Sequence, residues 1–312
     1  MYKKLLSHSA ALAAMIATAF FTSSRSAHAV TWGADYFTNV PFTTQDGQTV
    51  HFFDDLLKGK RVFINFIYTS CGDSCPLETA RLTQVKKILG DHMGKDIFFY
   101  SFTVDPDHDT PAELKKYAET FHTGPGWLFL TGKKKDLELV RKKLGQAATA
   151  GQNQVTDHST SLMIGNEATG EWLRDSSMDN PQYIATIVRD WLAGAGRRET
   201  TGSYANAPPL PNYVADRGGY LFNNQCGACH TIGKGDGLGP DLLGVTKHRD
   251  AGWVSAFIAK PDQMLSKKDP VAMALYAKYK QVKMPNLRLT DQDVNAIVRY
   301  LESQTTASGP GR

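Results

Sequence analysis

The chain has 312 residues, 41% of them hydrophobic and 21% charged, which is enough for about two globular domains of roughly 150 residues each. Three of its four net positive charges lie in the first 29 residues, which contain Lys3, Lys4 and Arg25 and no acidic residue. The remainder is therefore close to neutral. This balance gives no support to a nucleic-acid-binding function, and we expect no nucleic-acid partner.

Residues 1–29 have the pattern of a secretory signal peptide. Lys3 and Lys4 precede a short apolar core at 10–21, and Ala27-His28-Ala29 provides the small residues for cleavage before Val30. The core is too short to span about 30 Å of hydrocarbon, which takes about 20 residues, although an uncleaved anchor is the alternative. We expect cleavage near Ala29 and a periplasmic mature protein without a transmembrane segment.

Residues 30–192 are predicted to form an α/β domain, because strand-like and helix-like segments alternate. A hairpin is expected at 42–53, turning at Asp46-Gly47, and the apolar run 61–68 is expected to be a buried central strand. Thr110 and Pro111 predict the N-cap and first residue of a helix. The other predicted segments are helices at 76–89, 137–144 and 181–192, strands at 97–104 and 127–131, and a hairpin pairing 161–165 with 170–174.

Two cysteines, Cys71 and Cys75, lie at the predicted turn between the central strand and the next helix. We expect the helix N-terminus to lower the pKa of the Cys75 thiol. Two thiolates are soft ligands suited to Cu(I), and His158, just before the next strand, would complete a Cys₂His copper site. In an oxidising compartment the pair is alternatively a structural disulfide or a working thiol pair.

The first half closely resembles the SCO/SenC family of copper-binding proteins with a thioredoxin-like fold. The resemblance spans about residues 31–192 and rests on the segments TSCGDSCP at 69–76, VDPDHDTP at 104–111, WLFLTG at 127–132 and DHS at 157–159. It implies one copper bound by Cys71, Cys75 and His158, and a role in assembling the copper A centre of cytochrome oxidase. Some family members instead resemble thiol-disulfide reductases, in which Cys71 and Cys75 would be the catalytic pair.

Two residues depart from this family's usual pattern. Gly72 stands where many members have Pro, which is expected to loosen the loop between the cysteines. His108 stands where Arg is common, which is expected to alter the charge near the site. Family members are often anchored in the membrane, whereas the signal peptide predicts that this chain is released.

A linker at 193–213, rich in glycine, arginine and proline, is expected to separate the first domain from a second at 214–306. The second domain contains Cys226-Gly227-Ala228-Cys229-His230, the C-x-x-C-H signature of covalent haem attachment. Cys226 and Cys229 would bond the haem, and His230 would be its proximal iron ligand. Helices are predicted at 214–225, with Tyr220, Leu221 and Phe222 on the haem side, and at 253–258 and 291–303.

This half resembles the class I cytochromes c, a small all-α fold. The resemblance includes the glycine-rich segment 233–242, where Pro240 packs near the proximal histidine, and the extended segment 282–287 before the last helix. It implies a single covalent haem c with Met284 as the sixth ligand. Met264 and Met273 are the other candidates, but their helix-like surroundings favour core packing, and His248 is interpreted as a surface residue.

Three functions are consistent with this pair of domains. The first is a periplasmic copper-binding assembly factor whose copper or thiol redox state is coupled to its own cytochrome, a metallochaperone and electron-transfer protein rather than a classical enzyme. Its partner would be the oxidase subunit that carries copper A, or another periplasmic redox protein. The second is a thiol-disulfide oxidoreductase that exchanges electrons with its cytochrome domain. In the third, the first domain docks the cytochrome on an oxidase.

Overall fold

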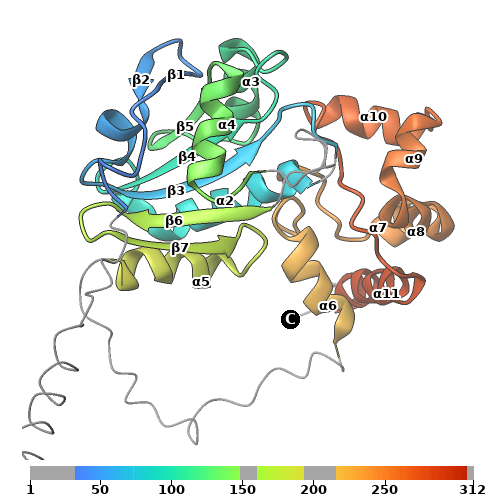
Figure 1. Cartoon of the computed structure of the whole chain (residues 1–312). Coiled ribbons are helices and arrows are strands. Elements are labelled where there is room, and N and C mark those ends of the chain that lie inside the picture. Colours follow the sequence, from blue (N-terminus) through green and yellow to red (C-terminus); the bar gives the residue numbers. More distant parts are fainter. Residues whose placement is uncertain (1–31, 73, 148–159, 193–215, 308–312) are drawn as a thin grey trace, which may run out of the picture. The chain divides into compact units, whose positions relative to one another are not determined.

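The computed structural model describes residues 32–72, 74–147, 160–192 and 216–307 (Figure 1). The predicted signal peptide, the predicted linker and the copper-ligand candidate His158 lie outside the described residues. The signal-peptide and linker boundaries therefore remain predictions. Within the described part of the chain, no helix combines the length and the apolar character needed to cross a membrane.

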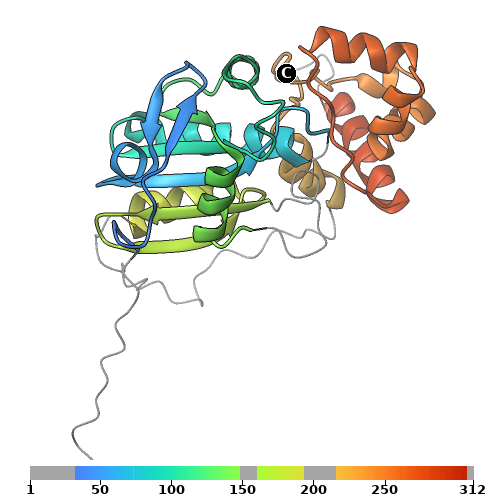
Figure 2. The same ribbon diagram turned by 45° about the horizontal axis from the view of Figure 1, so that its top comes forward.

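The described part of the first domain contains a seven-stranded sheet in the order β2-β1-β5-β4-β3-β6-β7. Neighbouring strands β3, β4 and β5 are parallel, whereas the hairpins β1/β2 and β6/β7 are antiparallel and lie at opposite edges (Figure 2). The predicted α/β architecture and both predicted hairpins are confirmed. The strands are β1 (Pro41–Thr44), β2 (Thr49–His51), β3 (Arg61–Ile67), β4 (Ile97–Thr103), β5 (Trp127–Thr131), β6 (Ser161–Asn166) and β7 (Glu171–Ser176).

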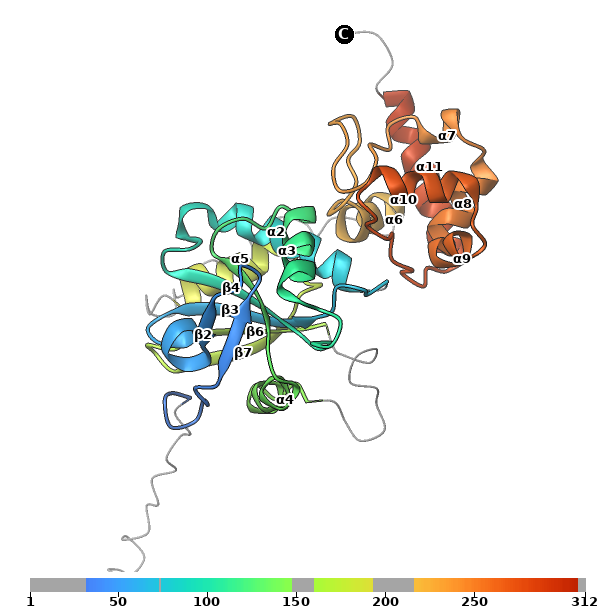
Figure 3. The ribbon, with the colours of Figure 1, turned by 90° about the horizontal axis from the view of Figure 1, so that it is seen from above.

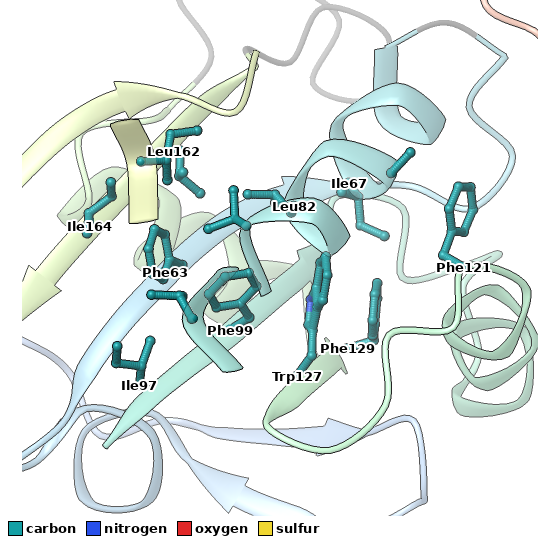
Figure 4. Close-up of a cluster of buried hydrophobic side chains, with 14 of the residues drawn as sticks. Phe63, Ile67, Leu82, Ile97, Phe99, Phe121, Trp127, Phe129, Leu162 and Ile164 are labelled. Carbon is teal, nitrogen blue, oxygen red and sulfur yellow. The ribbon is translucent and has the colours of Figure 1, made fainter. Parts of the chain in front are cut away.

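Strand β3 shows why the sheet has a core on both faces. Its side chains alternate, so Val62, Ile64 and Phe66 belong to one buried cluster while Phe63 and Ile67 belong to the other. Figure 4 shows the second cluster, in which Phe63 and Ile67 lie with Leu82, Phe99 and Trp127. A strand buried on both faces appears in the sequence as a continuous apolar run, as predicted for this segment.

Helices cover both faces of the sheet. The residues of α2 (Ser74–Leu89), α3 (Pro111–Thr120) and α5 (Pro181–Thr186) pack into the cluster that contains Phe63. Helix α4 (Lys134–Lys143) and the π-helix η1 (Phe52–Leu57) pack into the cluster on the other face. Seen from above, α4 lies on the side of the sheet opposite to α2 and α3 (Figure 3).

The N-terminus of α3 was predicted correctly, because it depends on local chemistry. Thr110 is its N-cap, and the Thr110 hydroxyl accepts a hydrogen bond from the Glu113 backbone N–H at 3.3 Å. Other boundaries differ, since α4 begins three residues before the predicted start. The predicted closing helix begins at Pro181 as expected, as α5, but its second half is a π-helix, η3 (Ile187–Trp191). Arg141 on α4 is buried over the ring of Phe66, so this helix is less solvated than its charges suggest.

The second domain is all-α, as predicted. On its final helix, Val294, Ile297, Val298 and Leu301 are all buried, which confirms the predicted apolar face. On the first helix Leu221 and Phe222 are buried, but Tyr220 is 43% exposed, so its predicted place on the haem side is wrong. The elements are α6 (Arg217–Leu221), the π-helix η5 (Phe222–Cys226), α7 (Val245–His248), α8 (Ala251–Ala259), α9 (Pro261–Ser266), α10 (Pro270–Lys278) and α11 (Asp291–Ala307).

The crossing of α6 and α11 depends on a glycine, Gly218. A Cβ atom at Gly218 would lie 2.2 Å from the Ala296 carbonyl oxygen on α11. We expect Gly218→Ala to force the helices apart and to lower the free energy of unfolding by about 1–3 kcal/mol. Chemical denaturation would measure the change. Gly227→Ala is the matched control, since its Cβ would meet nothing closer than 3.4 Å, and equal destabilisation by both substitutions would contradict this explanation.

Candidate functional site

The structure brings the first cysteine pair together where β3 leads into α2. Cys71 follows the strand, Cys75 lies in the first turn of α2, and both residues are buried, with Cys75 fully enclosed. The thiols are close enough for a hydrogen bond between their side chains. The predicted dithiol at a strand-to-helix turn is therefore present.

The thiol of Cys75 does not have the predicted electrostatic character. We expected the helix N-terminus to lower its pKa, but burial raises this pKa well above the usual value, and the nearby Cys71 thiol and Glu78 carboxyl raise it further. Desolvation outweighs the partial charge of the helix end because the sulfur is packed into the domain core. The raised pKa favours the neutral thiol form of Cys75, whose proton a metal cation can displace.

Two hydroxyl groups fix the backbone at Cys75. Its carbonyl oxygen accepts hydrogen bonds from the Thr79 hydroxyl at 2.9 Å and from the Tyr117 hydroxyl at 3.2 Å. Thr79 lies on the same helix, whereas Tyr117 comes from α3. The first turn of α2 is thus attached to a neighbouring helix at the residue that carries the thiol.

The loop before Cys71 is held by Asp109, which is fully buried. The carboxylate of Asp109 accepts hydrogen bonds from the backbone N–H of Thr69, at 3.1 and 3.2 Å to its two oxygens, and from the hydroxyls of Thr69 and Thr103. His108, exposed beside it, has a raised pKa because its ring hydrogen-bonds to Asp109. The charge change expected from His108 therefore acts on the residue that holds the cysteine loop.

The donor set around Cys71 and Cys75 fits a soft metal ion. Two adjacent sulfur atoms in an apolar surrounding suit Cu(I), and nearby backbone groups are already paired with other partners. His158 lies outside the described residues, and within them no cluster of three metal-ligating side chains occurs. The assignment of His158 as third ligand therefore remains a prediction.

In the second domain, the C-x-x-C-H motif forms one wall of a cavity. Cys226, Cys229 and His230 all line it, and burial raises the pKa of each thiol to about 12, which favours uncharged sulfur such as a thioether. Nδ1 of His230 hydrogen-bonds to the Pro240 carbonyl at 3.0 Å, so its Nε2 atom is left to face an iron. A Cβ at Gly239 would lie 2.6 Å from the His230 ring, so only glycine permits this approach.

Met284 lines the same cavity as His230 and lies in an extended segment, as predicted. Met264 and Met273 do not line it; Met273 is 39% exposed on α10, so the expectation that it packs in the core is wrong. His248 is exposed, as predicted, and it also lines the cavity. The apolar lining, the paired cysteines, an imidazole and a thioether together fit a covalently attached haem, with His230 and Met284 as the iron ligands it would take.

Asp236 connects the loop after His230 to the segment that leads to Met284. Its carboxylate accepts hydrogen bonds from Lys278 Nζ at 3.0 Å and the Tyr279 hydroxyl at 2.8 Å, and also from the Asp241 backbone N–H at 3.0 Å. These bonds lower the pKa of Asp236 to about 2. The next residues, Lys280 and Gln281, both have a positive φ, which residues other than glycine seldom adopt. The hydrogen bonds to Asp236 therefore hold the start of a strained turn.

Sequence reasoning missed Glu78 altogether, and it used Asp109 and Asp236 only as parts of motifs. Glu78 lies three residues after Cys75 on α2, a spacing that places two side chains on one helix face. That spacing was visible in the sequence. By contrast, nothing local to Asp109 indicates that it binds a loop 40 residues earlier.

The fold and the two sites define a thioredoxin-like dithiol domain joined to a c-type cytochrome domain. The chain belongs to the SCO1/SenC family, whose model matches residues 33–192, and a cytochrome c model matches residues 215–305. It is 34% identical over 152 residues to an SCO1 protein homologue from Bacillus subtilis, covering 46% of this chain and 76% of that protein. An SCO2-like protein from Rickettsia felis is 34% identical over 145 residues, covering 44% and 69%. The solved structure of ScoI from Bradyrhizobium japonicum with copper bound is 25% identical, with a TM-score of 0.41, covering 50% of this chain and 100% of that one.

Proposed function

We propose that this chain is a periplasmic copper-handling protein in which copper bound by Cys71, Cys75 and His158 exchanges electrons with a haem on Cys226 and Cys229. The observation that carries this proposal is the presence, in one chain, of a buried pair of adjacent thiols and a cavity lined by a C-x-x-C-H motif and a methionine. We further propose that it serves the assembly of the copper A centre of cytochrome oxidase.

The stoichiometry of the redox step supports copper as the partner of the haem. Copper changes by one electron, as the haem iron does, whereas a dithiol gives up two electrons on forming a disulfide. A haem with histidine and methionine ligands has a relatively high reduction potential, whereas the reduction potentials of dithiol couples lie well below zero. Ferrous haem would therefore not reduce a disulfide. A haem held by Cys226, Cys229, His230 and Met284 would supply one electron, which matches the one-electron change between Cu(II) and Cu(I) at Cys71 and Cys75.

The burial of the thiols weighs against thiol-disulfide exchange as the main activity. The attacking species in such exchange is a thiolate, and burial raises the pKa of Cys75, so little thiolate forms near neutral pH. A positively charged metal ion removes this obstacle because it replaces the protons directly. The first domain is therefore better suited to metal binding than to disulfide exchange.

A titration of the full, haem-loaded chain tests the proposal. Without oxygen, the thiol-reduced protein with ferrous haem should bind one Cu(II) per chain and lose one electron per copper from the haem, seen in the haem absorption spectrum. His158→Ala should weaken this binding. In Cys75→Ser the haem should no longer be oxidised stoichiometrically, and its oxidation should instead rise with the concentration of unbound copper. An unchanged haem spectrum at full copper occupancy would contradict electron exchange.

A further inference from the structure

Met284, the residue expected to be the sixth iron ligand, lies in a segment with little regular structure of its own. Residues 282–290 form neither helix nor strand, and Pro285, directly after the methionine, has no backbone N–H to donate. Gln281 and Arg288, on either side of Met284, have φ angles of 62° and 52°, a left-handed conformation that costs free energy in residues other than glycine. Contacts with neighbouring elements must therefore hold the methionine in place.

The first such contact lies before the methionine in the chain. Asp236, on the loop that follows the C-x-x-C-H motif, accepts hydrogen bonds through one oxygen from Lys278 Nζ at 3.0 Å and from the Tyr279 hydroxyl at 2.8 Å. Its other oxygen accepts a hydrogen bond from the Asp241 backbone N–H at 3.0 Å, which fixes the carboxylate itself. The loop of one expected iron ligand thus holds the start of the segment that carries the other.

The second contact lies after the methionine. Asn286, two residues beyond Met284, donates a hydrogen bond from its Nδ2 atom to Asp262 Oδ1 on α9, at 2.8 Å. The oxygen of the same amide accepts a hydrogen bond from the Arg288 backbone N–H at 3.0 Å. Asp262 therefore attaches the strained end of the segment to a helix.

We propose that Asp236 and Asp262 are positioning residues that keep the Met284 thioether at the haem iron, an inference that rests on the proposed haem site. Both carboxylates act through the segment that carries the methionine. While their hydrogen bonds hold, the thioether occupies the sixth position and closes it to other ligands. Without them, the strained segment moves away more often, and an added ligand can take the position.

The expected effect is moderate, because these contacts lie at the surface. Lys278 and Asp236 are both exposed, and an exposed ion pair contributes little by itself. The Tyr279 hydroxyl adds a second hydrogen bond to the same carboxylate. We expect loss of Asp236 to raise the fraction of chains with detached Met284 by about three- to tenfold.

Competition with imidazole measures this fraction. The full, haem-loaded ferric chain, free of copper, is titrated with imidazole at a fixed neutral pH, and loss of the methionine–iron absorption band is followed. Imidazole binds only where the thioether has left, so its apparent dissociation constant falls by the factor by which the detached fraction rises. Asp236→Ala should lower this constant about three- to tenfold, and Asp262→Ala should also lower it.

Two controls separate positioning from general destabilisation. Arg217→Ala breaks another surface ion pair of this domain, in which Arg217 Nε donates to Asp293 at 2.6 Å, and should leave the imidazole affinity unchanged. In chains that carry Met284→Ala there is no thioether to displace, so adding Asp236→Ala should change the affinity by less than about twofold. Tyr279→Phe removes one hydrogen bond to Asp236 and should give a smaller shift in the same direction, even if Asp236→Ala fails to fold.

Unchanged imidazole affinity in both aspartate variants would overturn the inference. An equal gain of affinity with and without Met284 would also overturn it, because the carboxylates would then control entry to the cavity and not the ligand. If Met284→Ala bound imidazole no more tightly than the wild type, Met284 would not be the sixth ligand. That result would overturn the proposed haem ligation itself, and this inference with it.

Discussion

Replacing Cys75 by serine should remove tight Cu(I) binding while leaving the haem in place. A serine hydroxyl is a hard, weak ligand for Cu(I), so the substitution removes one of two thiolates. Structural Zn²⁺ sites with four ligands contribute about 10–16 kcal/mol in zinc-finger peptides. On that scale, loss of one ligand costs roughly 3 kcal/mol, which corresponds to an affinity loss of about a hundredfold or more. Competition with a chromophoric Cu(I) chelator would measure it.

The matched control is the neighbouring position. Ser74→Ala alters the same helical turn without removing sulfur, so its Cu(I) affinity should stay close to that of the wild type. The haem spectrum should be the same in both variants, because Cys226 and Cys229 lie in the other domain. Equal affinities for Cys75→Ser and Ser74→Ala would show that copper binds elsewhere.

Replacing Met284 by alanine should have the largest effect on the cytochrome. We expect loss of the methionine–iron absorption band of the ferric form and a lower reduction potential, because thioether ligation favours ferrous iron. Axial ligation spans roughly 0.8 V among haem proteins, and a decrease of about a tenth of a volt or more is expected here. Absorption spectra and a redox titration would give both quantities.

Two further variants show whether the changed spectrum and reduction potential of Met284→Ala come from loss of the sixth iron ligand. Met273→Ala, at an exposed position on α10, should leave the band and the potential unchanged. His248→Ala tests the imidazole that also lies at the cavity. If His248→Ala lost the wild-type spectrum while Met284→Ala kept it, the sixth ligand would be His248.

Short-range chemistry explains what could be predicted from the sequence. The hairpin turn at Asp46-Gly47, the cap at Thr110 and the apolar run of β3 each depend on a few adjacent residues, and all three occur in the structure. The two cysteine pairs could be located for the same reason.

The features that could not be predicted depend on tertiary packing. The pKa of Cys75 is raised because α3 and the sheet enclose it, which its place at a helix N-terminus does not reveal. Tyr220 and Met273 are exposed because their helices turn other faces to the core. The role of His158 stays a prediction, as do the boundaries of the signal peptide and the linker.

The contacts of Asp109 have a consequence for how this family can change over time. The loop that carries Cys71 takes its position from a carboxylate in the segment 104–111, through Thr69 and Thr103. A substitution at Asp109 leaves the half-buried Thr69 N–H without its acceptor, so we expect it to destabilise the loop unless a residue near the cysteines also changes. We therefore expect that homologues which change the aspartate motif also change the residues before the first cysteine, which a comparison of family sequences would test.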